Sequence, residues 1–514
     1  MPALSKARAR RKRRKNPRIL IVTPEITYLP HGMGNMANRM TAKAGGLADV
    51  SSSLVSALFE LGADVHVALP HYRRMFNIDA GKLINEEQRV YMNKLPRDQI
   101  HLAEDRCFYY RDSVYANDEW SNKKVALAFQ REVINNIIPS VDPDLIHCND
   151  WMTGLVPGAA RRMDIPSLFT VHNIHTYDMT MAQIEDNGID AAEFWKYLYY
   201  KWPPSNYEGT RDFNPVDLLA SGIFGAHFIN TVSPTFLNEI CEGQHDFIPA
   251  NIRSEIISKN NHECASGILN APDPDCDPEI DQRLKIHYTA DTHLEGKRQN
   301  KATFQERVGL SVDPNAPLFF WPSRLDPVQK GCQLLSDILY EIVSTYWDDN
   351  LQIALVANGS YQQVFHNIVN QHDFGNKVAV CDFSEKLSRH AYAASDFMII
   401  PSLFEPCGLP QMVSSIYGSL PIARDTGGLH DTVDHLDIAN NRGNGFRFAD
   451  YDGGGLRWGI DEAMRFYRQP AEIKEAQITR IMKESRNRFN HRTTAEAYFE
   501  IYEKMLNRPI VRDF

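Results

Sequence analysis

The sequence has 514 residues, of which 43% are hydrophobic and 23% are charged, a composition typical of soluble globular proteins. A chain of this length is expected to fold as two or more domains. No stretch approaches the roughly 18–20 consecutive apolar residues of a membrane-spanning helix, so we expect no membrane partner. The formal net charge of −10 argues against nucleic acid as the main ligand.

The N-terminal segment is strongly basic and reads "KARARRKRRK" over residues 6–15. It lacks the apolar core of a secretory signal. We interpret residues 1–17 as a disordered, solvated tail, and binding to an anionic surface is the alternative. The 8 cysteines are scattered and form no C-x-x-C pair, so the sequence predicts neither a zinc site nor a disulfide framework. This pattern favours the reducing cytoplasm.

The first half of the chain alternates between strand-like and helix-like patterns. Residues 18–25 (RILIVTPE) predict a strand, residues 45–62 show the apolar periodicity of a helix, and residues 63–70 predict a second strand. Ser233 and Pro234 have the residue types of a helix start. Further strands are predicted at residues 144–150, 166–173 and 227–234. Alternating strands and helices predict a parallel sheet with helices on both faces.

The pattern weakens between about Gln244 and Asp281, where Pro and Asp are frequent, and we interpret this segment as a connector. A second alternating series begins near Pro317. Strands are predicted at residues 317–323, 351–358, 377–383, 396–402 and 420–425, and helices at 331–346, 385–395 and 493–506. We therefore expect two α/β domains.

Ligands of open parallel sheets bind outside the carboxyl ends of the strands, and polar residues follow several predicted strands in the first half. The motif "KAGGLADV" places Gly45 and Gly46 at a helix start beside Lys43. That arrangement favours an anion, although tight helix–sheet packing also explains the glycines. Lone histidines are more often structural, and for His147 and His175 that interpretation is at least as good as a functional one. No metal-binding spacing such as H-E-x-x-H occurs.

The second half repeats these features. The motif "SRLDPVQKG" supplies Arg324 and Lys330, which would suit a diphosphate, although a solvated surface loop is the alternative. The motif "DTGGLHDTV" repeats the glycine pair. Glu405 directly follows the apolar run "DFMIIPSLF", where an unpaired buried charge would be costly. This carboxylate would either contact a ligand or cap a helix predicted to begin at Pro406.

Taken together and in their order, these motifs resemble the glycogen and starch synthases, which are retaining glycosyltransferases with a GT-B fold. The resemblance runs from about Arg18 to about Leu506 and includes "KAGGLADV", "HCNDWMTGL", "FTVHN", "NTVSPTFLNEI", "SRLDPVQKG", "FEPCGLPQ" and "YGSLPIARDTGGLHDTV". It implies two Rossmann-like α/β domains that face a deep interdomain cleft. The implied segments are an acceptor-binding domain at 18–262, a nucleotide-sugar-binding domain at 263–490, and a helix at 491–514 that returns to the first domain.

The resemblance also implies the substrates and the residues that bind them. The donor would be a nucleotide-glucose, ADP-glucose rather than UDP-glucose, and the acceptor an α-glucan, with no cofactor and no metal. The implied catalytic residues are Glu405, His172, Asp150, Arg324 and Lys330. The implied donor-binding residues are Lys43, Gly45, Gly46, Asn173, Asn270, Phe383, Cys407, Gly408, Leu409, Thr426, Gly427 and Gly428.

The sequence departs from the family pattern at several places. Residues 26–42 lengthen the link between "VTPE" and Lys43, and "SRLDPVQKG" has one extra residue. On the donor side, "LNAPD" and "VANGS" replace the usual turns. Three alternatives therefore stay open: transfer from UDP-glucose, transfer to a small acceptor, and a non-catalytic glucan-binding protein.

Overall fold

The structure is a computed structural model that describes residues 14–34, 37, 40–76 and 99–511. Most of the predicted basic tail, and parts of the segment 26–42, lie outside these residues. Arg14, the first described residue, forms ion pairs with Asp142 (2.6 Å) and Asp144 (3.1 Å). The chain divides into two compact units: unit 1 comprises Met1–Val232, Leu237–Ile268 and His491–Phe514, and unit 2 comprises Ser233–Phe236 and Leu269–Asn490.

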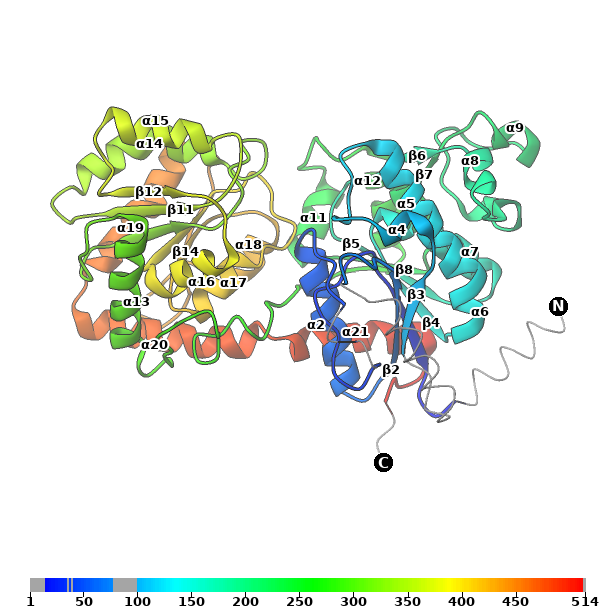
Figure 1. The fold of residues 1–514 in the computed structure, drawn as a ribbon, viewed down its shortest axis with the longest axis horizontal. Helices are drawn as coiled ribbons and strands as arrows, with labels where there is room; N and C mark the ends of the chain where they lie inside the picture. The colour runs from blue at the N-terminus through cyan, green and yellow to red at the C-terminus, as the bar shows by residue number, and fades with distance from the viewer. Residues whose placement is uncertain (1–13, 35–36, 38–39, 77–98, 512–514) are drawn as a thin grey trace. The chain divides into compact units, whose positions relative to one another are not determined.

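Unit 1 is built on a parallel sheet of seven strands in the order β3-β2-β1-β4-β5-β8-β9 (Figure 1). Its strands are nearly continuous runs of buried apolar residues, as expected for a sheet covered on both faces. They are β1 (Arg18–Val22), β2 (Asp64–Pro70), β3 (Ile100–Ala103), β4 (Leu145–Asn149), β5 (Ser167–Val171), β8 (Phe228–Thr231) and β9 (Ala265–Gly267). A separate antiparallel pair joins β6 (Asp178–Met179) and β7 (Val216–Asp217).

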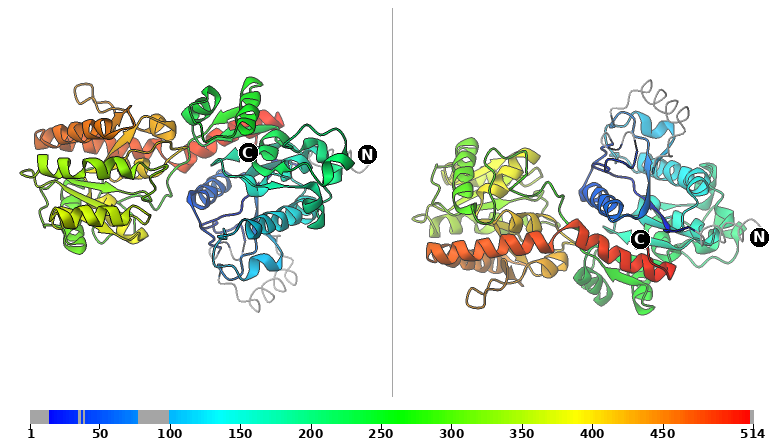
Figure 2. Two further views of the ribbon diagram at one scale, coloured as in Figure 1. Left: turned by 90° about the horizontal axis from the view of Figure 1, so that it is seen from above. Right: turned by 90° about the horizontal axis from the view of Figure 1, so that it is seen from below.

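The helices of unit 1 include one from the far end of the chain, α21 (His491–Leu506), which lies beside α2 (Gly46–Glu60), as Figures 1 and 2 show. The others are α4 (Arg106–Tyr109), α5 (Glu119–Glu132), α6 (Ile138–Val141), α7 (Val156–Arg162), α8 (Met181–Asp186), α9 (Tyr207–Arg211), α10 (Leu218–Gly225) and α12 (Ala250–Asn261). A π-helical turn, η2 (Val133–Ile137), joins α5 to α6, and short 3-10 turns are η3 (Trp151–Thr153), η4 (Ala191–Glu193) and η5 (Trp195–Tyr197). The helix α11 (Pro234–Glu242) begins in the short segment that belongs to unit 2 and continues in unit 1.

Unit 2 repeats this architecture with a parallel sheet of six strands in the order β12-β11-β10-β13-β14-β15. The strands are β10 (Leu318–Trp321), β11 (Gln352–Val356), β12 (Val378–Cys381), β13 (Phe397–Ile400), β14 (Leu420–Arg424) and β15 (Phe446–Phe448). The helices are α13 (His293–Val308), α14 (Cys332–Thr345), α15 (Gln362–Gln371), α16 (Glu385–Ala394), α17 (Pro410–Ile416), α18 (Gly427–Thr432), α19 (Gly453–Tyr467) and α20 (Ala471–Arg488). Two parallel-sheet α/β units therefore confirm the predicted fold class.

Two local predictions were wrong. The segment 244–281 was interpreted as a connector, but it contains α12 and the edge strand β9. Neither has a strong apolar pattern, because Ile252 and Ile256 are the buried residues of α12 and β9 is only half-buried. The helix predicted to begin at Pro406 begins instead at Pro410. Gly408 has a left-handed φ of +71°, which a continuous helix cannot accommodate.

The strand order reverses once in each sheet, between β1 and β4 in unit 1 and between β10 and β13 in unit 2. Such a reversal leaves a crevice outside the carboxyl ends of the two strands, where open α/β sheets bind ligands. All 8 cysteines are free thiols. Among the helices that the structure describes, none is long and apolar enough to cross a membrane.

Candidate active site

A buried carboxylate, Glu25, lies at the strand reversal of unit 1. Its Oε2 accepts hydrogen bonds from the amides of Ala44 (2.9 Å) and Gly45 (3.0 Å), and its Oε1 accepts one from the hydroxyl of Tyr115 (2.7 Å). The backbone amides predicted to bind an anion thus hold a carboxylate of the protein itself. Glu25 was not among the predicted site residues, since it lies within the predicted strand 18–25 and its partners come from other segments.

The rest of the "KAGG" motif remains accessible. The ammonium of Lys43 pairs with Asp49 at 2.8 Å and is partly exposed. A Cβ added to Gly45 or Gly46 would meet no atom within 4 Å. Close packing therefore does not require these glycines, and the geometry favours the interpretation that they leave room for a ligand.

Asp150 follows β4 at the same reversal, with a positive φ of 57° and only 2% of its surface exposed. Its two oxygens accept hydrogen bonds from the amide of His172 (2.8 Å) and the side chain of Asn173 (2.9 Å). Burial raises the pKa of Asp150 to about 7, and the nearby negative charge of Glu25 adds to this effect. Asp150 is therefore a carboxyl group that titrates near neutral pH.

His172 follows β5, beside Asp150. Its Nε2 donates a hydrogen bond to Oδ1 of Asn149 at 2.9 Å. Burial lowers the pKa of His172 to about 3, so its ring is neutral at pH 7. The donating Nε2 leaves Nδ1 as an acceptor, which suits hydrogen bonding to a hydroxyl group better than neutralisation of an anion.

The other two histidines of this region lack such a role. His147 is fully buried and bonds to the hydroxyls of Tyr502 (2.8 Å) and Thr170 (2.6 Å). This arrangement ties β4 to α21 within unit 1 and supports the structural interpretation. His175 is exposed and packs edge-on against Trp151 and Tyr177.

In unit 2, Lys330 and Glu405 form an ion pair of 2.5 Å beside the strand reversal. Glu405 is 9% exposed, and the hydroxyl of Ser402 donates a further hydrogen bond to it at 3.1 Å. The helix α17 has no side-chain cap, so the capping interpretation of Glu405 was wrong. The charge after the apolar run is instead stabilised by a lysine from the loop after β10.

That loop packs closely on the end of β13. Gly331 has a left-handed φ of +70°, and a Cβ there would lie 2.2 Å from the carbonyl oxygen of Pro401. The close contact brings Lys330 within reach of Glu405. Arg324, from the same loop, is exposed, and its guanidinium makes no ion pair with any described residue. It is available to an anionic ligand.

Asn270 and Cys407 form a second part of this site. Asn270 is 6% exposed, and among the described residues its Oδ1 has no hydrogen-bond partner. Burial raises the pKa of the Cys407 thiol to about 12, so the thiol is not nucleophilic at pH 7. The unpaired oxygen of Asn270 is an acceptor that a bound hydroxyl group would satisfy.

The segment from Gly408 to Leu409 precedes α17, and Thr426 precedes α18. Thr426 is buried, and a Cβ on Gly428 would lie 2.0 Å from the carbonyl oxygen of Cys407. The amide of Gly428 donates to the carbonyl of Glu405 at 2.9 Å. For Gly428 the geometry therefore shows the packing role rather than an open anion site.

Phe383 follows β12 and is 55% exposed. Its amide donates to Oδ1 of Asn358 at 2.8 Å. Asn358 belongs to "VANGS", one of the departures from the family pattern, and its amide side chain holds the backbone that presents the Phe383 ring. An exposed ring of this kind can stack on a nucleobase.

Comparisons with known proteins agree with this architecture. Residues 18–249 match the starch synthase catalytic domain model, and residues 303–480 match the model for glycosyl transferases group 1. The glycogen synthase of Moorella thermoacetica is 32% identical over 96% of this chain and 97% of its own length. That of Bacillus cytotoxicus is 30% identical over 90% of this chain and 96% of its own. The catalytic domain of starch synthase IV from Arabidopsis thaliana, solved with ADP and acarbose, superposes with a TM-score of 0.74 at 25% identity, covering 96% of this chain and 100% of that domain.

Proposed function

Because the chain belongs to the glycogen and starch synthase family, with its GT-B fold and glucan-elongating glycosyltransferase activity, we propose that it transfers glucose from ADP-glucose to the non-reducing end of an α-1,4-glucan. Transfer proceeds with retention of the anomeric configuration. The ion pair of Lys330 with Glu405 at the strand reversal of unit 2 carries this proposal.

Unit 2 binds the donor. Arg324 and Lys330 neutralise the diphosphate that leaves, and the exposed guanidinium of Arg324 supports this role. Phe383 stacks on the nucleobase. The unpaired Oδ1 of Asn270 accepts a hydrogen bond from a donor hydroxyl, and the backbone at residues 407–409, 426 and 427 contributes to donor binding, whereas the amide of Gly428 is held by the carbonyl of Glu405.

The remaining polar groups hold the transferred glucose. Asp150 and His172 accept hydrogen bonds from its hydroxyls, with Asn173 fixing the carboxyl group of Asp150. Glu405 contacts the sugar from unit 2, and Lys43 with Gly45 and Gly46 contributes to the donor phosphates. Glu405, which pairs with Lys330, faces the developing positive charge of the sugar.

The chemistry exchanges one bond at the anomeric carbon for another. The bond from this carbon to the diphosphate oxygen breaks, and the oxygen of the acceptor hydroxyl forms the new bond on the same face. The proton of that hydroxyl passes to the departing diphosphate. Arg324 and Lys330 stabilise the negative charge that develops on the diphosphate, which is the larger electrostatic requirement of the reaction.

The solved starch synthase IV structure, which holds ADP, supports ADP-glucose as the donor. The similarity to a bacterial glycogen synthase and the free cysteines support a cytoplasmic location. Both statements go beyond the family assignment and are part of this proposal.

The test is a donor panel with glycogen as acceptor. Purified protein is incubated with radiolabelled ADP-glucose or UDP-glucose, and incorporation into glycogen and the linkage of the product are measured. We expect α-1,4-linked incorporation, faster from ADP-glucose. Faster incorporation from UDP-glucose would overturn the donor assignment, and transfer only to a small sugar would overturn the acceptor.

The Glu405→Gln variant is the matched control for the same assay. Absence of incorporation from both donors in the wild-type protein, with glucan binding retained, would favour a non-catalytic glucan-binding protein. Incorporation in the wild-type protein that disappears in the variant excludes that alternative.

A further inference from the structure

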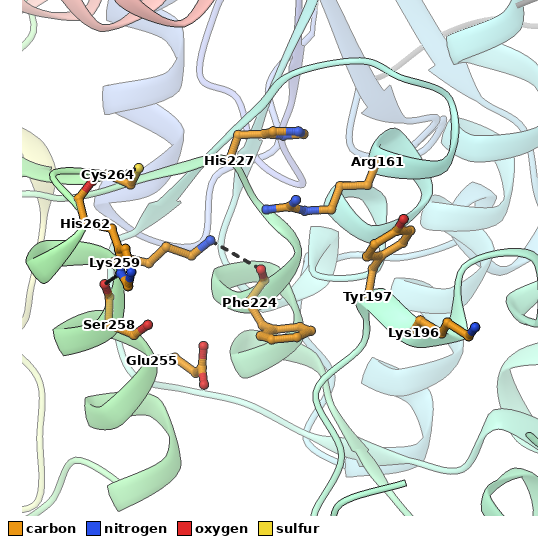
Figure 3. A pocket seen from close by; sticks show the side chains of 10 residues that line it. All are labelled: Arg161, Lys196, Tyr197, Phe224, His227, Glu255, Ser258, Lys259, His262 and Cys264. Atoms are coloured by element: carbon orange, nitrogen blue, oxygen red, sulfur yellow. Dashed lines mark hydrogen bonds between the residues drawn. The ribbon is translucent and has the colours of Figure 1, made fainter. Parts of the chain in front are cut away.

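A pocket of about 470 Å³ lies in unit 1 (Figure 3). It lies at the opposite end of the strands from Asp150 and His172. Two of its lining residues, His227 and Cys264, directly precede β8 and β9, whereas Asp150 and His172 directly follow β4 and β5. The pocket therefore opens at the amino ends of the strands. It is lined by Arg161, Lys196, Tyr197, Phe224, His227, Glu255, Ser258, Lys259, His262 and Cys264.

Two cations reach into this pocket from facing walls, Arg161 from α7 and Lys259 from α12 (Figure 3). The guanidinium of Arg161 donates to the carbonyls of Gly225 (2.5 Å) and Ala226 (3.0 Å). The ammonium of Lys259 donates to the carbonyls of Ala226 (2.5 Å) and Phe224 (3.3 Å). These carbonyls end α10, where helical carbonyls lack intrahelical partners.

Capping of α10 explains the position of both cations, and the carboxyl group of Glu255 interacts with Lys259 only at longer range than an ion pair. Neither Arg161 nor Lys259 forms an ion pair with any carboxylate among the described residues. The one acidic residue of the lining, Glu255, has its pKa raised by burial. Burial lowers the pKa of Arg161, and burial together with the charge of Arg161 brings the pKa of Lys259 to about 8. The pocket thus has a positive potential that an anion would relieve.

Unused donors remain on both side chains. A guanidinium has five N–H groups and an ammonium three, and the carbonyl contacts occupy two positions on each. Lys196, exposed on η5, adds a third cation at the rim. Phosphate oxygens suit this combination of a planar guanidinium and two ammonium groups.

The apolar part of the lining is aromatic. Tyr197 is 38% exposed and Phe224 is 37% exposed, and both rings line the cavity (Figure 3). Sites for small ligands combine such apolar walls with a few polar groups that fix orientation. The ring faces offer a surface for the carbon skeleton of a ligand whose anionic group meets the cations.

We propose that this pocket binds a phosphate group, as inorganic phosphate or as the phosphate of a sugar monoester, through Arg161, Lys196 and Lys259. The site is separate from the donor-binding residues of unit 2, and its occupation does not depend on the function proposed above.

The test measures binding by isothermal titration calorimetry on the full chain, with inorganic phosphate and with glucose 1-phosphate as separate probes. The variants are Lys259→Gln and Lys196→Gln. The matched control is Lys201→Gln, because Lys201 lies over the Trp202 ring as Lys196 lies over the Trp195 ring, but outside the pocket. A further control, Lys330→Ala, removes binding at the donor site.

We expect Lys259→Gln to weaken phosphate binding about tenfold or more, since it removes a charged hydrogen-bond donor. Lys196→Gln is expected to weaken it about threefold because this lysine is exposed. Lys201→Gln is expected to bind as the wild-type protein does, and Lys330→Ala is expected to lose only binding at the donor site and to retain binding at the pocket. Tighter binding of glucose 1-phosphate than of phosphate would identify a sugar phosphate as the ligand, and equal or weaker binding would identify free phosphate.

The proposal is overturned if neither probe binds the wild-type protein below about 10 mM, an affinity too weak for a specific site. It is also overturned if the affinity is unchanged in both pocket variants or if all binding disappears in Lys330→Ala. Melting temperatures separate misfolding of Lys259→Gln from loss of binding. If Lys259→Gln misfolds, Lys196→Gln still tests the proposal, because Lys196 lies on the surface.

Discussion

In each unit a carboxyl group follows the strand at the reversal of strand order, Asp150 after β4 and Glu405 after β13. The two groups differ in whether a positive charge lies beside them. In unit 2, Glu405 pairs with Lys330 at 2.5 Å. In unit 1, Asp150 accepts hydrogen bonds from the neutral groups of His172 and Asn173 and forms no ion pair with any described residue, and a second carboxylate, Glu25, raises its pKa further. Glu405 thus lies against a positive charge, whereas burial raises the pKa of Asp150 to about 7.

This difference indicates which part of the reaction each unit can support. An ion pair beside an open loop provides fixed charges for a substrate whose own charge changes during the reaction. Asp150, whose pKa is about 7, and the neutral His172 can form hydrogen bonds with hydroxyl groups without a strong electrostatic field. The division fits diphosphate departure at unit 2 and sugar recognition at unit 1.

The largest expected effect is on the charged pair of unit 2. We expect Lys330→Ala and Glu405→Gln each to lower kcat about 10³-fold, the upper range for loss of one group that stabilises transition-state charge. Each single change also leaves a buried partner unpaired and so lowers the melting temperature.

The double variant Lys330→Ala/Glu405→Gln separates these two effects. We expect it to regain part of the lost stability but none of the activity, as measured by thermal unfolding and glycogen incorporation. Single variants that unfold more easily yet retain near-normal kcat would show that the pair is only structural.

The second prediction concerns the unpaired carboxyl group of unit 1. The pKa of Asp150 is about 7 in the folded protein and 3.8 in the unfolded reference, so the unfolded state loses its proton first as the pH rises. The free energy of unfolding should therefore fall by about 2–3 kcal/mol from this group between pH 5 and pH 8.

Asp150→Asn removes this titration. Denaturant unfolding at pH 5, 6, 7 and 8 should show a shallower decline in the variant than in the wild-type protein. Parallel declines would mean that Asp150 is ionised throughout this range and that the two units treat their carboxylates alike.

The third prediction compares the glycine pairs of the two units. Gly428→Ala places a Cβ 2.0 Å from the carbonyl oxygen of Cys407 and should lower the free energy of unfolding by about 2 kcal/mol through overpacking. Gly46→Ala places its Cβ in open space at the start of α2. It should leave stability unchanged or raised by about 0.5 kcal/mol.

Activity completes the comparison of these glycines. If Gly46 leaves room for the donor, Gly46→Ala should raise the KM for the nucleotide-sugar about fivefold, a loss of about 1 kcal/mol in binding. An unchanged KM would show that this glycine pair, too, serves only the fold.

The smallest effect, on the KM for the donor, is expected from substitution of Phe383. This residue of unit 2 is compared with no residue of unit 1. Phe383→Ala should raise the KM for the donor about threefold to tenfold through lost base stacking. Phe383→Tyr, which keeps the ring, is the matched control and should retain the wild-type KM. Equal values for all three proteins would exclude stacking at this position.

Much of the fold could be predicted from the sequence because buried parallel strands appear in it as runs of apolar residues. The predicted strand at 166–173 contains β5 (Ser167–Val171), and the one at 396–402 contains β13 (Phe397–Ile400). The helix α12 and the edge strand β9 escaped prediction because they are only partly buried, and their sequences carry little apolar periodicity. The start of α17 was misplaced because a left-handed Gly408 leaves no pattern that sequence alone distinguishes from a helical glycine.

The candidate site was found unevenly for the same reason. Residues directly after strong strands, such as Asp150 and His172, could be selected from strand ends alone. Glu25 was missed because its partners, the amides of Ala44 and Gly45 and the hydroxyl of Tyr115, come from distant segments. The sequence did not predict the pocket at Arg161 and Lys259, since nothing in either neighbourhood indicates that they converge on the end of α10.

The sequence by itself determined the alternation of elements, the two α/β units and the family, because periodicity and ordered motifs are local properties of the chain. Only the tertiary structure decided the state of each charge. Glu405 is paired because the close contact of Gly331 with Pro401 brings Lys330 to it. Within the described part of the chain Asp150 has no such partner, and it is buried near Glu25. Pairing and desolvation depend on segments far apart in the chain, and these two quantities set the protonation on which the chemistry depends.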